Sequence, residues 1–214
     1  SINSHTIQTS KWADAFIGFL PYKLTDGQHN AWSEILRDVK SHKVMNRLLQ
    51  GDVGSGKSVI AELALLTMSE AGYQGCLMAP IEVLAKQHYD NFVEDFKKFI
   101  EEIGISVRCG LLTGSMTAKE KKNLYKALET HEIDILIGTH AVIQGKVSFD
   151  NLGMVITDEQ HRFGVNQREW LSGKGESPHV LVMSATPIPR TLAIILYGEL
   201  DISVIRELPA KRKA

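Results

Sequence analysis

The chain has 214 residues, of which 43% are hydrophobic and 23% are charged, so the composition excludes a disordered or collagen-like protein. The chain has 24 Lys and Arg residues and 25 Asp and Glu residues, so no overall basic excess indicates nucleic-acid binding. Any nucleic-acid partner must therefore be bound by local groups. Two cysteines without CxxC spacing, Cys76 and Cys109, exclude a disulfide framework and argue against zinc; we expect buried free thiols in a reducing cytoplasm.

The first residues, SINSHTIQTS, contain neither an initiating Met nor the apolar run of a signal peptide, so we expect a piece of a longer protein. Residues 1–15 are interpreted as a linker or the end of a preceding domain, residues 16–209 as one domain, and residues 210–214 as a basic tail. Apolar runs reach only about six residues, too short for a membrane span, so no membrane partner is expected.

Along the chain, short apolar runs alternate with longer amphipathic segments. At residues 25–41, Trp32, Ile35, Leu36 and Val39 follow helical spacing, and Thr25 or Asp26 suits the N-cap. Strands are predicted by the apolar runs at residues 47–50, 75–79, 107–112, 133–138, 154–157, 180–184 and 202–205. Further helices are predicted at residues 57–71, 82–102, 117–130, 165–172 and 189–197.

Continuous apolar runs suit strands that are buried on both faces, as in a parallel sheet that helices cover. The alternation therefore predicts a doubly wound α/β domain, with a mostly parallel sheet and helices on both faces. In such sheets ligands bind at the carboxyl ends of the strands, so we expect functional residues directly after the apolar runs.

The run at 47–50 leads into GDVGSGKS, which fits the phosphate-loop pattern G-x-x-x-x-G-K-[ST] at the start of a predicted helix. Its glycines let backbone N–H groups curl into an anion-binding nest, while Lys57 can reach the β and γ phosphates and Ser58 can join the shell of Mg²⁺. An ordinary Gly-rich turn is the alternative, which the flanking strand and helix disfavour. The predicted nucleotide-binding residues are Gly51, Asp52, Val53, Gly54, Ser55, Gly56, Lys57 and Ser58.

The run at 154–157 leads into two carboxylates. We assign Asp158 to direct or indirect ligation of Mg²⁺, and Glu159 to orienting or deprotonating the attacking water. A solvated turn would be the better explanation of this acidic pair if it stood alone. Its combination with the phosphate loop favours nucleotide hydrolysis.

Three longer strings make the pattern specific. GDVGSGK at 51–57, DEQHRFGV at 158–165 and MSATPIPRTLA at 183–193 resemble the RecG family of bacterial branched-DNA helicases, within superfamily 2. The resemblance extends from about residue 16 through LPYKLTDGQ at 20–28, MAPIEVLAKQH at 78–88, LLTGS at 111–115, IGTHAVIQ at 137–144 and YGELDISVIRELP at 197–209. It implies the first RecA-like motor lobe of an ATP-dependent helicase, a P-loop NTPase domain that uses ATP and Mg²⁺.

The resemblance also implies roles for single residues. Gln28 would recognise adenine, since an amide can donate and accept together. His161 would act beside Lys57, Asp158 and Glu159 in catalysis, and would couple the nucleotide to Ser184 and Thr186. Contacts to the DNA backbone would come from Pro80, Glu82, Thr113, Gly114, Ser115, Thr139 and His140. Two departures from the family pattern are Ile81 in place of Thr, and Thr157 in place of an aliphatic residue.

For the whole enzyme, the resemblance implies branched or forked DNA as the partner in recombination and repair, a cytoplasmic location, and a second RecA-like lobe and a wedge domain in cis. The isolated chain is expected to turn over little ATP, because arginine fingers would come from the second lobe. Two alternatives stay open. One is the lobe of a transcription-repair coupling factor, which Ser55 and Gln160 disfavour, and the other is a P-loop ATPase that does not act on DNA.

Overall fold

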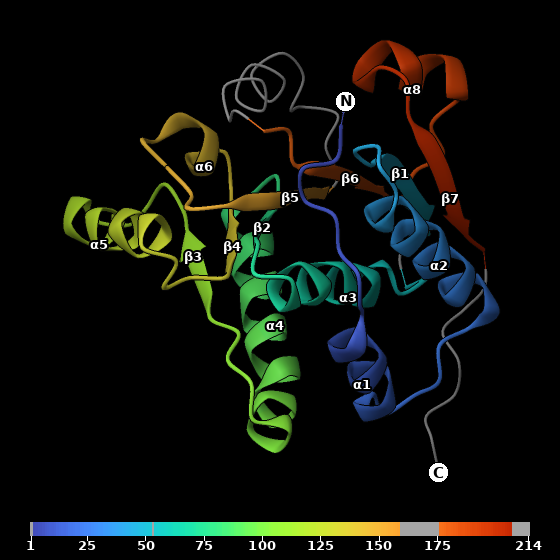
Figure 1. Ribbon diagram of the computed structural model, residues 1–214. Helices are drawn as coiled ribbons and strands as arrows, with labels where there is room; N and C mark the ends of the chain where they lie inside the picture. The colour runs from blue at the N-terminus through green and yellow to red at the C-terminus, as the bar shows by residue number, and fades with distance from the viewer. Residues whose placement is uncertain (1, 53, 159–175, 207–214) are drawn as a thin grey trace.

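The computed structural model describes residues 2–52, 54–158 and 176–206 (Figure 1). Its helices are α1 (Lys11–Phe19), α2 (Asp26–Lys40), α3 (Lys57–Glu70), α4 (Glu82–Ile103), α5 (Ala118–Glu129), α6 (Ala141–Gln144) and α8 (Arg190–Tyr197). Its strands are β1 (Asn46–Gly51), β2 (Gln74–Met78), β3 (Cys109–Leu112), β4 (Ile135–Gly138), β5 (Leu152–Asp158), β6 (His179–Ser184) and β7 (Asp201–Ile205). Each predicted strand is present, and the predicted helix at 165–172 lies outside the described residues.

The described strands form one parallel sheet in the order β3-β4-β2-β5-β6-β1-β7. Parallel strands place their carboxyl ends at one edge of the sheet, which we call the carboxyl edge. It is formed by the last residues of the seven strands, Gly51, Met78, Leu112, Gly138, Asp158, Ser184 and Ile205. The strands whose ends carry the predicted functional residues therefore converge on one side of the molecule.

Alternating residues of the strands pack against helices on opposite faces of the sheet. Leu77 and Ile156 face a core shared with α1 to α4, whereas Cys76 and Val155 face a second cluster with α5 and α6. Side chains along a strand point alternately to the two faces, so a sheet covered on both needs continuous apolar runs. The prediction of an α/β domain with helices on both faces is confirmed (Figure 1).

Both cysteines are free, as expected from their spacing. Cys76 is buried, while Cys109 is only half-buried. Burial is the largest cause that raises the pKa of Cys109 to about 12, so its thiol stays protonated at neutral pH. Within the described residues, no helix is both long and apolar enough to cross a membrane.

Helix α1 was not predicted, and it begins inside the segment interpreted as a linker. Ala13 and Phe16 are buried in the same core as α3 and α4, so the predicted boundary between residues 15 and 16 falls within a packed helix. Their spacing of three residues was a helical signal, but the segment is short and follows a polar stretch. The limits of the ATP-binding domain remain a prediction.

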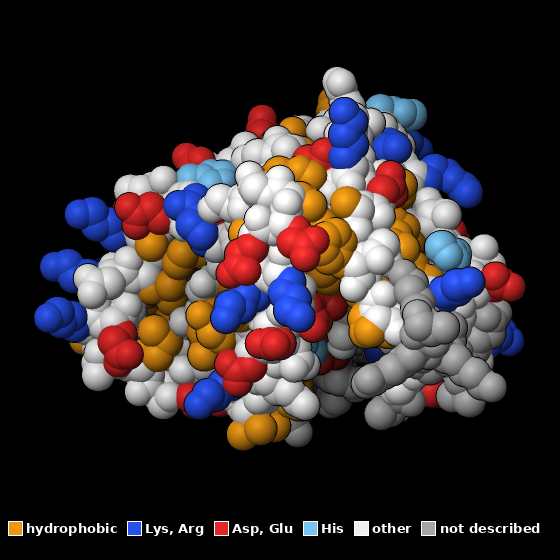
Figure 2. Space-filling view, turned by 90° about the horizontal axis from the view of Figure 1, so that it is seen from below, with side chains coloured by type: hydrophobic (Ala, Val, Ile, Leu, Met, Phe, Trp, Pro, Cys, Tyr) orange, Lys and Arg blue, Asp and Glu red, His pale blue; other side chains and the backbone are white. Residues whose placement is uncertain are grey.

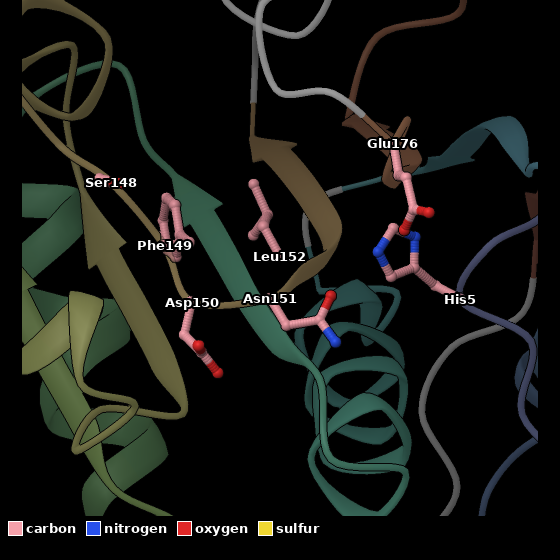
Figure 3. A pocket seen from close by; sticks show the side chains of 7 residues that line it. All are labelled: His5, Ser148, Phe149, Asp150, Asn151, Leu152 and Glu176. Carbon is pink, nitrogen blue, oxygen red and sulfur yellow. The ribbon is translucent and has the colours of Figure 1, made fainter.

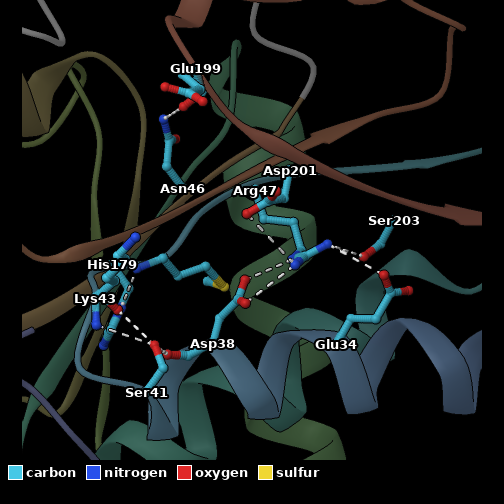
Figure 4. Close-up of polar contacts among 11 residues, drawn as sticks. Glu34, Asp38, Ser41, Lys43, Asn46, Arg47, His179, Glu199, Asp201 and Ser203 are labelled. Carbon is cyan, nitrogen blue, oxygen red and sulfur yellow. Dashed lines mark hydrogen bonds and ion pairs between the residues drawn. The ribbon is translucent and has the colours of Figure 1, made fainter.

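Helix α2 is held to the sheet by one buried guanidinium (Figure 4). Arg47, on β1, donates from Nε to Asp38 at 2.8 Å and from Nη1 to Ser203 at 3.0 Å, with Glu34 at 3.4 Å. Only 8% of the Arg47 side chain is exposed, so its charge needs these partners. The contacts connect α2 and β7 to β1, the strand that leads into the phosphate loop.

At the amino ends of the strands, opposite the carboxyl edge, the neutral imidazole of His179 connects three segments. His179, which is 0% exposed, accepts a hydrogen bond at Nδ1 from the Met45 N–H at 2.9 Å (Figure 4). Its Nε2 lies 3.2 Å from the carbonyl oxygen of His5, and since a carbonyl can only accept, Nε2–H is the donor. Burial is the main cause that lowers the pKa of His179 to about 4.

We expect His179 to make stability depend on pH between about 4 and 6.5. In that window His179 is protonated in the unfolded chain but stays neutral in the folded chain, so protonation favours the unfolded state. The free energy of unfolding therefore falls as pH falls, by about 2 kcal/mol between pH 7.5 and pH 5. Urea unfolding at the two pH values, for the parent and for His179→Gln, measures this difference. If both lose the same stability on acidification, His179 is not responsible.

Candidate nucleotide-binding site

The predicted phosphate loop lies between β1 and α3, as its sequence pattern requires. Gly54 and Gly56 have φ angles of 85° and 87°, a left-handed conformation that glycine adopts without steric cost. Gly56 is the N-cap of α3, so the first helical turn, whose N–H groups point toward the loop along the helix axis, follows directly. The loop thus combines the backbone curl and the helix N-terminus that bind phosphate. Val53 lies outside the described residues.

The side chains of the loop match this use. Lys57 is folded back over the loop, where its Nζ donates to the carbonyl oxygen of Gly51 and, at 3.4 Å, to that of Asp52. The Ser58 hydroxyl is exposed at the start of α3. Ser55 is buried, and its hydroxyl has no hydrogen-bond partner among the described residues. The ammonium group of Lys57 and the hydroxyl of Ser55 therefore both lie within the predicted loop.

Gln28 lies directly against the loop and is fully buried. Its Oε1 accepts from the Thr25 N–H at 2.9 Å, which completes a capping box at the start of α2. Its Nε2 lies 3.4 Å from the carbonyl oxygens of both Ser55 and Gly56. The structure brings Gln28 and the phosphate loop together, 27 positions apart in sequence. Its role toward adenine remains a prediction.

Asp158 is the last residue of β5, one strand away from β1 across β6. Its side chain is 14% exposed, and its Oδ2 lies 2.8 Å from Nε2 of His88 on α4. His88 was missed by the sequence analysis, although a polar residue on the buried face of a helix was a signal that could have found it. Glu159 and His161 lie outside the described residues. The hydroxyl of Thr157 is buried without a partner in the described part of the chain.

The predicted coupling residues lie between the loop and Asp158. Ser184 ends β6, pairs with Gln50 of β1, and donates from Oγ to the carbonyl oxygen of Thr186 at 3.0 Å. The Gln50 side chain in turn accepts from the Ile188 N–H at 3.4 Å. These bonds join the segment after β6 to the strand that enters the phosphate loop. The coupling role is still a prediction.

The predicted DNA contacts gather at the neighbouring ends of β2, β3 and β4. Ser115 donates its hydroxyl to the Glu82 carboxylate, and its Oγ lies 3.5 Å from that of Thr113. Thr113 is only 2% exposed, whereas Gly114 and Ser115 are exposed. Thr139 accepts from the Ala141 N–H at 3.4 Å, while Pro80, Thr139 and His140 are half-buried. The structure thus groups these residues at one part of the carboxyl edge.

A separate polar cavity lies where β5 begins, at the edge of the sheet opposite the loop (Figure 3). It is lined by His5, Ser148, Phe149, Asp150, Asn151, Leu152 and Glu176. None of these residues belongs to the predicted nucleotide site. The loop and Asp158, rather than this cavity, define the candidate site.

Comparison with known families agrees with this geometry. The model of the family described as "DEAD/DEAH box helicase" matches residues 25–195, which include the phosphate loop, Asp158 and Ser184. The chain belongs to the DEAD/DEAH box helicase family. Because helicases of this kind are built on RecA-like lobes, the match also agrees with the parallel α/β fold described above.

Within this family the chain is RecG-like. It is 53% identical over 203 residues to the ATP-dependent DNA helicase RecG of Thermotoga maritima, covering 95% of this chain and 25% of that protein. It is 56% identical over 196 residues to that of Aquifex aeolicus, covering 91% of this chain and 24% of the relative. The chain therefore spans about a quarter of the length of the curated relatives it matches.

Solved structures give the same result. A structure of RecG bound to a three-way DNA junction has a TM-score of 0.81 at 46% identity, over 98% of this chain and 27% of that one. The UvsW helicase of bacteriophage T4 has a TM-score of 0.64 at 19% identity, over 95% of this chain and 70% of that one, which supports the fold alone. The prediction of a RecA-like fold is confirmed.

Proposed function

We propose that the chain is the ATP-binding first motor lobe of an ATP-dependent DNA helicase that acts on branched DNA in recombination and repair. One observation carries this proposal: the phosphate loop, Asp158 and the Ser184 to Thr186 segment lie at the ends of three adjacent strands, β1, β5 and β6. The residues proposed to act on the phosphates and the segment proposed to transmit the nucleotide state thus lie together at the carboxyl edge. The RecG relatives favour this function over the coupling-factor alternative.

The residues of the loop fit a nucleotide. The glycine curl and the first turn of α3 supply backbone N–H donors, and the ammonium of Lys57 supplies a charge for the phosphates. Gln28, beside the loop, would contact the adenine edge. Glu159 would orient the attacking water and His161 would transmit the nucleotide state, as the sequence predicts.

Mg²⁺ also fits the donors present. The exposed hydroxyl of Ser58 and the carboxylate of Asp158 are oxygen ligands of the kind that Mg²⁺ prefers. When bound, the ion would neutralise charge on the phosphate oxygens. Asp158 would hold it directly or through water, and Ser58 would fix it beside the loop.

DNA would lie along the ends of β2, β3 and β4. The net charge of the chain is −1, and on the face in Figure 2 basic and acidic side chains are interspersed, so backbone contacts must come from local groups. RecG has been solved on a three-way junction, which supports branched DNA as the substrate. A second RecA-like lobe and a wedge domain in cis, in a cytoplasmic enzyme, complete the proposal.

Calorimetric titration of Mg·ATP tests the nucleotide site. We expect Lys57→Ala to weaken binding at least tenfold, because one charge-assisted bond to phosphate contributes about 1.5–3 kcal/mol. Gln28→Ala should weaken it less. Lys119→Ala, a lysine exposed on α5, is the matched control and should bind like the parent. Equal affinities for the parent and Lys57→Ala would refute the assignment of the loop.

A further inference from the structure

The bond between His88 and Asp158 joins the predicted metal ligand to a helix that the phosphate chemistry does not otherwise use. Nε2 of His88 lies 2.8 Å from Oδ2 of Asp158, and both side chains are 14% exposed. A carboxylate oxygen only accepts hydrogen bonds, so the imidazole N–H is the donor. The residues are 70 positions apart, so the bond exists only because the fold brings this part of α4 to the end of β5.

The direction of His88 is set by the core. It lies three residues after Ala85 and four before Phe92, both fully buried, so these three side chains share one face of α4. Phe96 and Phe99 continue the same buried face toward the end of the helix. Turning α4 so that the Cα–Cβ bond of His88 pointed away from Asp158 would require this apolar face to leave the core.

The N-terminal end of the same helix lies among the predicted DNA contacts. Helix α4 begins at Glu82, whose carboxylate accepts from the Ser115 hydroxyl. Glu82 and His88 are six residues apart, about 9 Å along a helix. One rigid element therefore connects the predicted DNA edge with the carboxylate that would hold Mg²⁺.

We propose that His88 is a positioning residue for Asp158, which fixes the orientation of its carboxylate toward Mg²⁺ and links it to helix α4. This inference rests on the proposed function, since it assigns a partner to the predicted metal ligand. Hydrogen-bond partners of metal ligands orient them, and their loss lowers metal affinity by about 10–100-fold.

The test measures how much Mg²⁺ strengthens ATP binding, as the ratio of calorimetric dissociation constants in EDTA and in Mg²⁺. We expect His88→Leu to reduce this ratio about tenfold while leaving binding in EDTA unchanged, because the phosphate loop is untouched. His88→Gln, whose amide can still donate to Asp158, should retain the ratio, and the shorter His88→Asn should lose it. Gln87→Leu, an exposed neighbour on α4, should match the parent.

Asp158→Asn separates the two hypotheses. If it abolishes the effect of Mg²⁺ while His88→Leu and His88→Asn retain it, the role of His88 is overturned and the metal site stands. If the parent gains nothing from Mg²⁺, or Asp158→Asn changes nothing, the proposed metal site fails and the inference fails with it. Urea unfolding of each variant establishes whether it is folded. If His88→Leu does not fold, the comparison of His88→Gln with His88→Asn still tests the role of His88.

Discussion

Phe16→Ala is expected to lower the free energy of unfolding by about 4 kcal/mol, the range for deleting a buried aromatic ring. Phe16 is 1% exposed, and its ring packs edge-on against Phe96 at 5.2 Å and Phe99 at 5.3 Å between centroids. Truncation removes these aromatic contacts and leaves a cavity between α1 and α4, which the surrounding core cannot fill. Urea denaturation at pH 7 measures the loss.

Phe19 provides the control within the same helix. The ring centroids of Phe19 and Phe99 are 5.3 Å apart, but Phe19 is 41% exposed. Phe19→Ala should therefore lower the free energy of unfolding by about 1 kcal/mol or less. A large difference between the two variants would show that α1 belongs to the folded core rather than to a linker. Two small and equal losses would contradict this packing and support the predicted boundary before residue 16.

Gly56→Ala is expected to weaken Mg·ATP binding about 100-fold, or about 2.7 kcal/mol. Gly56 has a φ of 87°, and an added Cβ would lie 1.9 Å from Nε2 of Gln28. The Gln28 amide would have to leave the loop, and the loop itself would be strained by about 1–2 kcal/mol. Both the proposed adenine contact of Gln28 and the N–H groups proposed to bind phosphate would be displaced. Calorimetry measures the affinity.

Gly72→Ala is the matched control for this experiment. Gly72 has the same φ of 87°, after α3, but nothing lies within 4 Å of an added Cβ. It should lose about 1 kcal/mol of stability from backbone strain and bind Mg·ATP like the parent. If Gly56→Ala also binds like the parent, the close approach of Gln28 to the loop has no part in nucleotide binding.

Much of the site could be predicted because its signals are local. The phosphate loop is one continuous string whose glycines and lysine have their roles wherever a strand precedes it and a helix follows. The apolar run at 154–157 likewise predicted both β5 and the carboxylate at its end. Helix α1 escaped prediction because nine residues give few helical repeats, and its burial depends on aromatic partners in α4.

The sequence by itself determined every described strand, most of the described helices, the α/β class and the candidate nucleotide residues, since periodicity and phosphate-loop chemistry depend on neighbours in the chain. Only the tertiary structure decided which distant groups meet. Gln28 reaches the loop because α2 packs against α3, and His88 reaches Asp158 because the buried face of α4 orients it. Such contacts follow from the packing of whole elements around a shared core, which no local pattern encodes.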